Sequence, residues 1–152
     1  KFDTQQEIID NFCVVRLEYY HLRKKHQVNA LEQTLRILGN KERFITEVIK
    51  KTLRVMEQDE TATIKQLDSR GYDKDPRDQT YSYLLRLPIR TFTTDKVKDL
   101  KNDIAGLRKD LSTLHKTKVE KIWLRELKEL EKEYNKWLKV MEKRVPKKGR
   151  RK

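Results

Sequence analysis

Apolar residues recur every three or four positions in two long stretches of this sequence, one at its beginning and one in its last third. That spacing places them on one face of an α-helix. The first stretch holds two successive rows, which predicts a long helix that changes its packing partner along its length. Thr4 and Glu7 form a capping-box pattern at its start, and Gly39 is expected to weaken or kink it. The first row is Ile8, Phe12, Val15, Tyr19 and Leu22, and the second is Val28, Leu31, Leu35 and Leu38.

The last third predicts a return helix and a final helix. Thr93 to Asp95 supply a cap and an acidic first turn to the return helix. A second capping-box pattern, from Thr117 to Glu120, begins the final helix. Two helices with apolar seams that run out and back should pair as an antiparallel coiled coil. The return row is Val97, Leu100, Ile104, Leu107, Leu111 and Leu114, and the final row is Trp123, Leu127, Leu130, Tyr134, Trp137 and Met141.

The middle of the sequence predicts a small tip. A helix-period apolar cluster lies in 41–51, and 52–56 alternates as a short extended piece would. A further helix is expected to start at Asp59 or Thr61 and to end before Gly71. The stretch 81–89 is the most apolar and aromatic in the chain, and Pro88 closes any helix there. The predicted fold is mainly α, with an outgoing arm helix (1–40), a tip (41–92), a return arm helix (93–116), a final helix (117–144) and a basic tail (145–152), which should be disordered past Pro146.

Composition agrees with exposed helices more than with a compact globule. Only 36% of the 152 residues are hydrophobic, and 40% are charged, as expected for helices with narrow apolar seams. No apolar run is long enough to cross a membrane, so no membrane partner is expected. No secretory signal is visible, and the start at Lys1 indicates an internal segment. A single cysteine, Cys13, excludes an internal disulfide and favours an intracellular location.

The net charge of +13 is concentrated at one end. Residues 139–152 hold eight basic residues and one acidic residue, Glu142. Such a cluster indicates a nucleic-acid patch or a nuclear localisation signal, with a solvated basic end as the alternative.

No residue pattern predicts catalysis. The three histidines, at 21, 26 and 115, lack the spacing of a metal site. Cys13 is expected to be a small packing residue, and the four glycines are scattered singly, so no phosphate-binding loop is present. We therefore predict no catalytic residue, no cofactor site and no metal ligand in this chain.

Five landmarks follow one another in order over about residues 2–137. They are Glu7 to Phe12 followed by Val15 to Tyr20 and the basic pair Arg23 and Lys24, Asn40 to Ile45, Arg70 to Pro76, Tyr83 to Pro88 with Thr93 to Val97, and Ile122 to Leu127. Together they resemble the coiled-coil arm of eukaryotic-type DNA topoisomerase II. One departure is useful: only 77–82 stands where animal members carry a long acidic insertion, which indicates a compact microbial or viral member. Another is Thr117–Lys118, where the family commonly has proline. The active-site tyrosine and the magnesium-binding acids of the family lie upstream of this region, so none is assigned here.

The resemblance implies a mechanical part of an enzyme that uses ATP and Mg²⁺ to pass one DNA duplex through a break in another. The tip would join two subunits in an isologous contact and form the exit gate, or C-gate, with ordinary tip core as the alternative role for its apolar residues. Basic residues on the arm would face the passing duplex, or would simply be solvated. The enzyme would be nuclear in a eukaryotic cell, and in the host cytoplasm or nucleus if viral. The candidate interface residues are Phe44, Ile45, Val48, Ile49, Tyr83, Leu84, Leu85 and Leu87, and the candidate DNA contacts are Arg16, Arg23, Lys24 and Arg36.

Two functions of other classes stay open. A nucleic-acid-binding helical arm, as in seryl-tRNA synthetases, would end in a tight turn rather than a tip of about fifty residues. A structural coiled coil with a dimerising hinge, as in chromosome-maintenance proteins, would have far longer arms and a hinge richer in glycine and strand.

Overall fold

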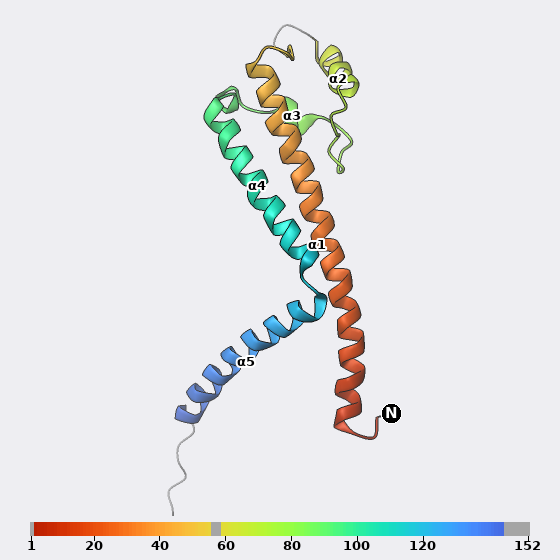
Figure 1. The fold of residues 1–152 in the computed structure, drawn as a ribbon, viewed down its shortest axis with the longest axis vertical. Helices are drawn as coiled ribbons and strands as arrows, with labels where there is room; N and C mark the ends of the chain where they lie inside the picture. The colour runs from red at the N-terminus through yellow and green to blue at the C-terminus, as the bar shows by residue number, and fades with distance from the viewer. Residues whose placement is uncertain (1, 56–58, 145–152) are drawn as a thin grey trace, which may run out of the picture. The chain divides into compact units, whose positions relative to one another are not determined.

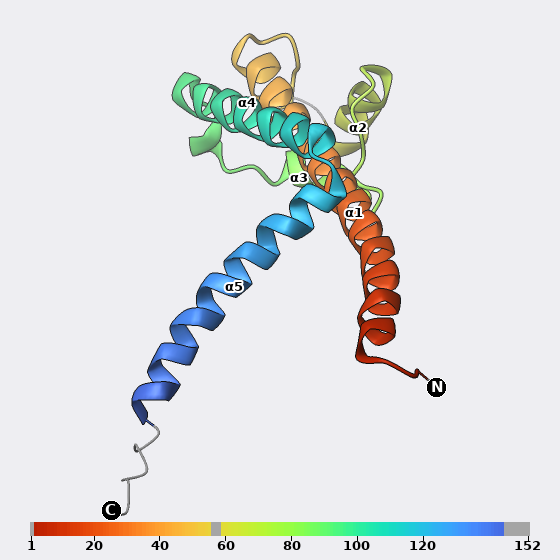
Figure 2. The ribbon, with the colours of Figure 1, turned by 60° about the horizontal axis from the view of Figure 1, so that its bottom comes forward.

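The computed structural model describes residues 2–55 and 59–144, and within them every regular element is helical (Figures 1 and 2). The predicted mainly α fold is confirmed. Residues 52–55 of the expected extended piece form turns and irregular backbone, while Met56 and the basic tail 145–152 lie outside the described residues. The elements are α1 (Gln5–Ile49), α2 (Glu60–Ser69), α3 (Ser82–Leu85), the 3₁₀ turn η1 (Ile89–Thr91), α4 (Thr94–Lys116) and α5 (Val119–Arg144).

The helix starts follow the expected capping chemistry. The Glu7 amide donates to Thr4 Oγ1 at 3.2 Å, and Glu7 Oε2 accepts from the Asp3 amide at 2.9 Å, so the return bond of this capping box reaches one residue before the cap. At α4, the Lys96 amide donates to Thr93 Oγ1 at 3.2 Å. These side chains satisfy amides that the first turn of a helix leaves without partners.

The weakening or kink expected at Gly39 does not end the helix. Helix α1 continues without interruption from Gln5 to Ile49. A glycine inside a helix costs about 1 kcal/mol relative to alanine. Burial of Phe44 and Ile45 in the turns that follow outweighs that cost.

The chain divides into two compact units, and α1 contributes to both: Lys25–His115 form one, and Lys1–Lys24 with Lys116–Lys152 form the other. In the first unit, the later part of α1 pairs with α4 in opposite directions. Lys101 lies 3.7 Å from Glu42, and His115 lies 3.7 Å from Glu32, so positions advance on one helix as they fall on the other. The rows from Val28 to Leu38 and from Val97 to Leu114 are half-buried or buried on these two helices.

The tip of that unit has its own small core. Phe44 lies at its centre, with its ring edge-on to Tyr72 at 6.3 Å and tilted against Phe92 at 6.1 Å. Aromatic edge-to-face contacts of this kind add to the gain from burial. The core cluster consists of Phe44, Leu53, Leu67, Tyr72, Tyr81 and Leu84.

In the other unit, the first part of α1 meets the start of α5 at a mixed aromatic and charged cluster. The rings of Tyr20 and Trp123 stack at 5.5 Å. The Tyr20 hydroxyl donates to Glu126 at 2.6 Å, and Arg23 forms an ion pair with the same carboxylate. The rest of both apolar rows is exposed in the described chain: Ile8, Phe12, Val15, Tyr19 and Leu22 on α1, and Leu127, Leu130, Tyr134, Trp137 and Met141 on α5.

Candidate functional site

The end of α1 is fixed to the end of α2 by a charged network around Glu47. Arg43 Nε lies 2.8 Å from one Glu47 oxygen, and Arg70 Nη1 lies 2.9 Å from the other. Arg70 also donates to the Thr52 carbonyl at 2.6 Å. Burial alone would raise the pKa of Glu47, but the hydrogen bond from Arg43 and the two guanidinium charges outweigh it and lower the pKa. The network therefore holds the carboxylate ionised and joins two helices that are distant in sequence.

The loop between α2 and α3 is held down by tyrosine hydroxyls. Tyr81 donates to Asp68 at 2.7 Å and approaches the Tyr72 carbonyl at 3.0 Å. Burial, together with the bond to Asp68, raises the pKa of Tyr81 to about 12. Tyr83 donates to the Asp73 carbonyl at 2.6 Å, and Asn40 donates to the Asp73 carboxylate at 3.1 Å. These bonds give the loop one defined conformation against the arm.

Helix α1 ends in a Schellman motif with an unusual residue in it. The Thr52 amide donates to the Glu47 carbonyl at 2.9 Å, and the Lys51 amide donates to the Val48 carbonyl at 3.0 Å. The motif requires a left-handed residue, and Lys51 supplies it with φ of 58°. Glycine usually occupies this position because a β-carbon is strained there.

A cavity of about 640 Å³ opens beside that turn, and we call it the tip socket. Five of its seven lining residues are apolar, and the other two are the cations Lys51 and Arg54. Pockets that bind partners combine apolar walls with a few polar groups in this way. The lining is Val48, Ile49, Lys51, Leu53, Arg54, Val55 and Phe92.

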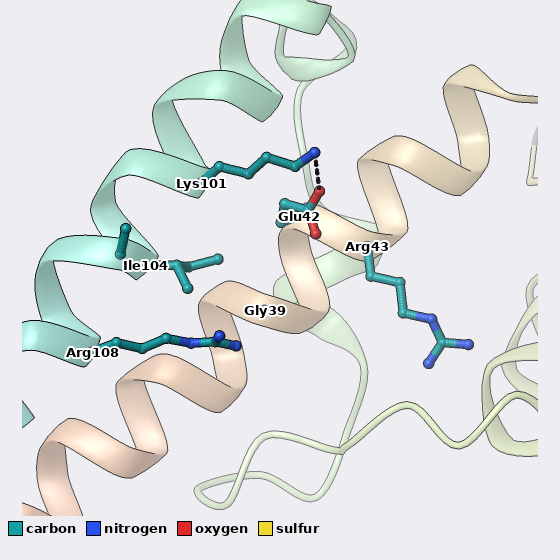
Figure 3. Close-up of a pocket in the computed structure, with 7 residues that line it drawn as sticks. Gly39, Glu42, Arg43, Lys101, Ile104 and Arg108 are labelled. Carbon is teal, nitrogen blue, oxygen red and sulfur yellow. Dashed lines mark ion pairs between the residues drawn. The ribbon is translucent and has the colours of Figure 1, made fainter. Parts of the chain in front are cut away.

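A second hollow, of about 550 Å³, lies between α1 and α4 (Figure 3). Lys101 reaches across it to Glu42, Arg108 extends from α4 toward the Gly39 turn, and Arg43 points away on the other side of α1. Arg43 lies over the Tyr72 ring at 4.4 Å and bonds to Glu47, so it is committed to the tip core. Four of the seven residues that line the hollow are charged, in contrast to two of seven in the tip socket.

The predicted interface residues fall into two groups in the structure. Phe44, Ile45 and Leu84 are each about 1% exposed, so they fill the interior of the tip. The other five are half-buried or exposed, and two of them, Val48 and Ile49, line the tip socket. The residues that remain accessible are Val48, Ile49, Tyr83, Leu85 and Leu87.

The predicted DNA-contact residues mostly have partners within the chain. Arg16 and Arg23 both lie over the Tyr20 ring, at 5.1 Å and 4.4 Å. Lys24 Nζ donates to the Thr117 carbonyl at 2.8 Å. Arg36 is exposed, with no ion pair to any residue in 2–55 or 59–144. Arg23 thus links α1 to α5, Lys24 links α1 to the residues just before α5, and Arg16 contacts Tyr20 on its own helix.

Sequence reasoning missed two features. One is the bond from Tyr20 and Arg23 to Glu126, which lowers the pKa of Glu126, first through Arg23. The other is Ile89, which is 76% exposed on η1 beside the socket residue Phe92. The sequence signal was the position of Ile89 after Pro88, at the end of the most apolar stretch of the chain and outside any helical row.

Two kinds of site are absent from the part of the chain that the structure describes. No helix in 2–55 or 59–144 is apolar enough over a sufficient length to cross a membrane. In the same ranges, no three histidine, cysteine, aspartate or glutamate side chains gather where they could bind a metal ion.

Comparison with known families decides the relationship. The family model described as the A subunit of DNA gyrase/topoisomerase IV matches residues 1–128. The chain belongs to this family. Within the gyrase A family it is similar to proteins named DNA topoisomerase 2, at 28% identity in Plasmodium falciparum, 30% in Invertebrate iridescent virus 6 and 26% in Penicillium chrysogenum. The resemblance to eukaryotic-type topoisomerase II is therefore confirmed.

A solved structure of a topoisomerase contains the same fold. The crystal structure of the DNA-binding, cleavage and re-ligation domain of Plasmodium falciparum topoisomerase II matches with a TM-score of 0.80 and 25% identity. The match covers 94% of this chain and 23% of that chain. The sequence relatives are covered at 86–90% of this chain and only 10–12% of their own length. The chain is thus similar to one region of much longer topoisomerases.

Proposed function

We propose that this chain is the coiled-coil arm and exit-gate tip of a type II DNA topoisomerase, and that the tips of two subunits associate to close the gate. The observation that carries the proposal is the tip itself. It has its own core at the end of an unbroken helix, and it presents an open apolar socket beside that helix end. The family membership supports the same function, because the relatives are named as DNA topoisomerases.

The surface chemistry of the tip suits a contact that forms and breaks. Its accessible apolar residues are few, and the socket rim carries Lys51 and Arg54 without any acid. An interface built on such a surface should be moderate in size, unlike the extensive apolar interfaces of obligate dimers. A gate that must open in each cycle needs an interface that holds two subunits together but can also separate.

The arm is long enough to hold the tip away from the rest of the enzyme, and it presents a weak positive charge to the transported duplex. Helix α1 spans 45 residues, or roughly 67 Å at 1.5 Å per residue. Among the predicted DNA contacts, we propose that Arg36 acts on DNA directly, through sequence-independent attraction that weakens with salt. We propose that Arg16, Arg23 and Lys24 act mainly by holding the arm together.

The rest of the enzyme supplies the chemistry in this proposal. ATP, Mg²⁺ and the cleavage tyrosine would be bound or provided by regions that correspond to the larger, unmatched part of the relatives. The proposed activity implies a nuclear location in a eukaryotic cell, or the host cytoplasm or nucleus for a virus.

Light scattering of the 152-residue chain at low and high salt separates the proposal from a nucleic-acid-binding arm. We expect a dimer that persists at high salt, because an apolar contact is not screened. A monomer at both salt concentrations that binds RNA or DNA tightly would favour the alternative.

Joined to a type II topoisomerase cleavage region, the chain should support plasmid relaxation, and deletion of 41–90 should abolish plasmid relaxation. Unchanged relaxation after that deletion would contradict the gate function.

A further inference from the structure

Ile89 is the most exposed large apolar residue of the unit that contains the tip. Among the described residues of 25–115, only Ile49 and Ile89 are large apolar side chains with high exposure, at 36% and 76%. The other large apolar side chains of the tip are buried or half-buried, and Ile89 is exposed far more than any of them. Single exposed apolar residues are common on protein surfaces, so exposure alone does not make Ile89 a contact residue; what draws attention to it is its place on the same 3₁₀ turn as Phe92, a residue that lines the tip socket.

The backbone holds Ile89 rigidly. It begins the 3₁₀ turn η1 after Pro88, whose φ of −63° is fixed by its ring. The Thr91 amide donates to the Pro88 carbonyl at 2.8 Å, and the Phe92 amide donates to the Ile89 carbonyl at 3.0 Å. A side chain on such a turn loses little backbone freedom when it binds, so its burial is converted efficiently into affinity.

Ile89, which we call the knob, and the tip socket belong to one surface. Phe92, which lines the socket, is bonded to the carbonyl of Ile89. Because Ile89 stays exposed, it does not fill the socket of its own chain. In an isologous dimer, the knob of each copy meets the socket of the other copy. Two equivalent contacts form in this way, and the assembly is complete with two copies.

We infer that Ile89 of each chain inserts into the tip socket of a second copy, so that two identical knob-and-socket contacts hold the gate closed. This inference rests on the proposed tip dimer and names the residues that make it. The occupant is a second copy, because the tip that carries the apolar socket also carries an exposed apolar side chain that does not fill it. Lys51, Arg54 and Arg90 bring positive charge to both sides of the contact, and their repulsion limits its strength. That limit suits a contact that opens repeatedly.

The strained Lys51 fits this arrangement. Glycine would complete the Schellman motif without strain, yet this chain carries a lysine whose side chain lines the socket mouth. Backbone strain kept at a surface cavity commonly marks a functional position. We assign Lys51 the role of keeping the rim of the socket positively charged.

A mixing experiment tests the inference with two variants of the 152-residue chain. Ile89→Asp removes the knob and leaves the socket open, and Ile49→Trp fills the socket and leaves the knob. Ile9→Asp, at a site that is 53% exposed on α1 in the other unit, is the matched control. Circular dichroism melting checks that each variant is folded, and sedimentation velocity gives the dissociation constant of each.

We expect each tip variant to weaken self-association at least about tenfold, as loss of a central apolar anchor does, and the control to match the parent chain. An equimolar mixture of the two variants should associate more tightly than either alone, because the mixed dimer restores one intact knob and socket. A dimer of normal affinity in both tip variants would overturn the inference and leave the tip dimer standing. Weak variants that do not rescue each other would also overturn it. A parent chain that stays monomeric would overturn the proposed dimer itself.

Discussion

Two tyrosines of the tip core show how differently one residue type is used. The Tyr81 hydroxyl is bonded to Asp68 and lies 3.0 Å from the Tyr72 carbonyl. The Tyr72 hydroxyl is buried and forms no hydrogen bond of good geometry with the described residues, although burial and then the nearby Glu47 carboxylate raise its pKa. Its ring, in contrast, contacts Phe44 and lies under Arg43. The value of Tyr72 to the tip therefore lies in its ring.

The pair predicts opposite effects of the same substitution. Tyr81→Phe should destabilise the chain by about 1–2 kcal/mol, because it removes the hydrogen bond to Asp68, which keeps only its ion pair with Lys74, and the one to the Tyr72 carbonyl. Tyr72→Phe should leave the free energy of unfolding unchanged or raise it by up to about 1 kcal/mol, because it removes only an unsatisfied buried hydroxyl. Urea unfolding of both variants measures this. Equal losses in the two would show that the Tyr72 hydroxyl bonds to Glu47, whose charge adds to burial in raising the pKa of Tyr72.

The helices show what the sequence could and could not determine. The periodic rows placed α1, α4 and α5 correctly, because a repeated spacing survives the details of packing. Local propensity indicated a weak position at Gly39, yet α1 continues past it, because propensity does not register the burial of Phe44 just beyond. The burial of the interface candidates was equally hidden. Phe44 and Ile49 share one helix and one apolar character, and only the tertiary contacts of the tip separate core from surface.

Two glycines give a prediction about these helices. Gly39 lies inside α1, where an added β-carbon would meet nothing within 4 Å, so Gly39→Ala should stabilise the chain by about 0.5–1 kcal/mol. Gly71 has a φ of +69°, so Gly71→Ala should destabilise it by about 1 kcal/mol or more. Thermal melting of the two variants tests both signs together. A loss of stability in Gly39→Ala would mean that the arm needs flexibility or close approach at that turn.

For the whole molecule, the structure separates a part that is internally complete from one that is not. The tip and its arm, in Lys25–His115, bury their apolar rows and expose little beyond Ile49 and Ile89. The unit of Lys1–Lys24 and Lys116–Lys152 exposes both of its rows instead. The sequence identified these rows as seams, but a seam reveals neither its partner nor whether the partner lies within the same 152 residues.

The distance between two copies, measured by pulsed electron paramagnetic resonance, tests most directly whether the tips are where two chains meet. One spin label replaces the exposed Lys50, which directly follows the last residue of α1, and in a second sample one replaces the exposed Glu18 within α1, both with Cys13→Ser. The two positions are about 48 Å apart at 1.5 Å per residue. We predict a short, well-defined distance between the labels at 50 and a longer one between the labels at 18. A short distance at 18 with none at 50, or no dipolar coupling at either position, would contradict a gate closed by its tips.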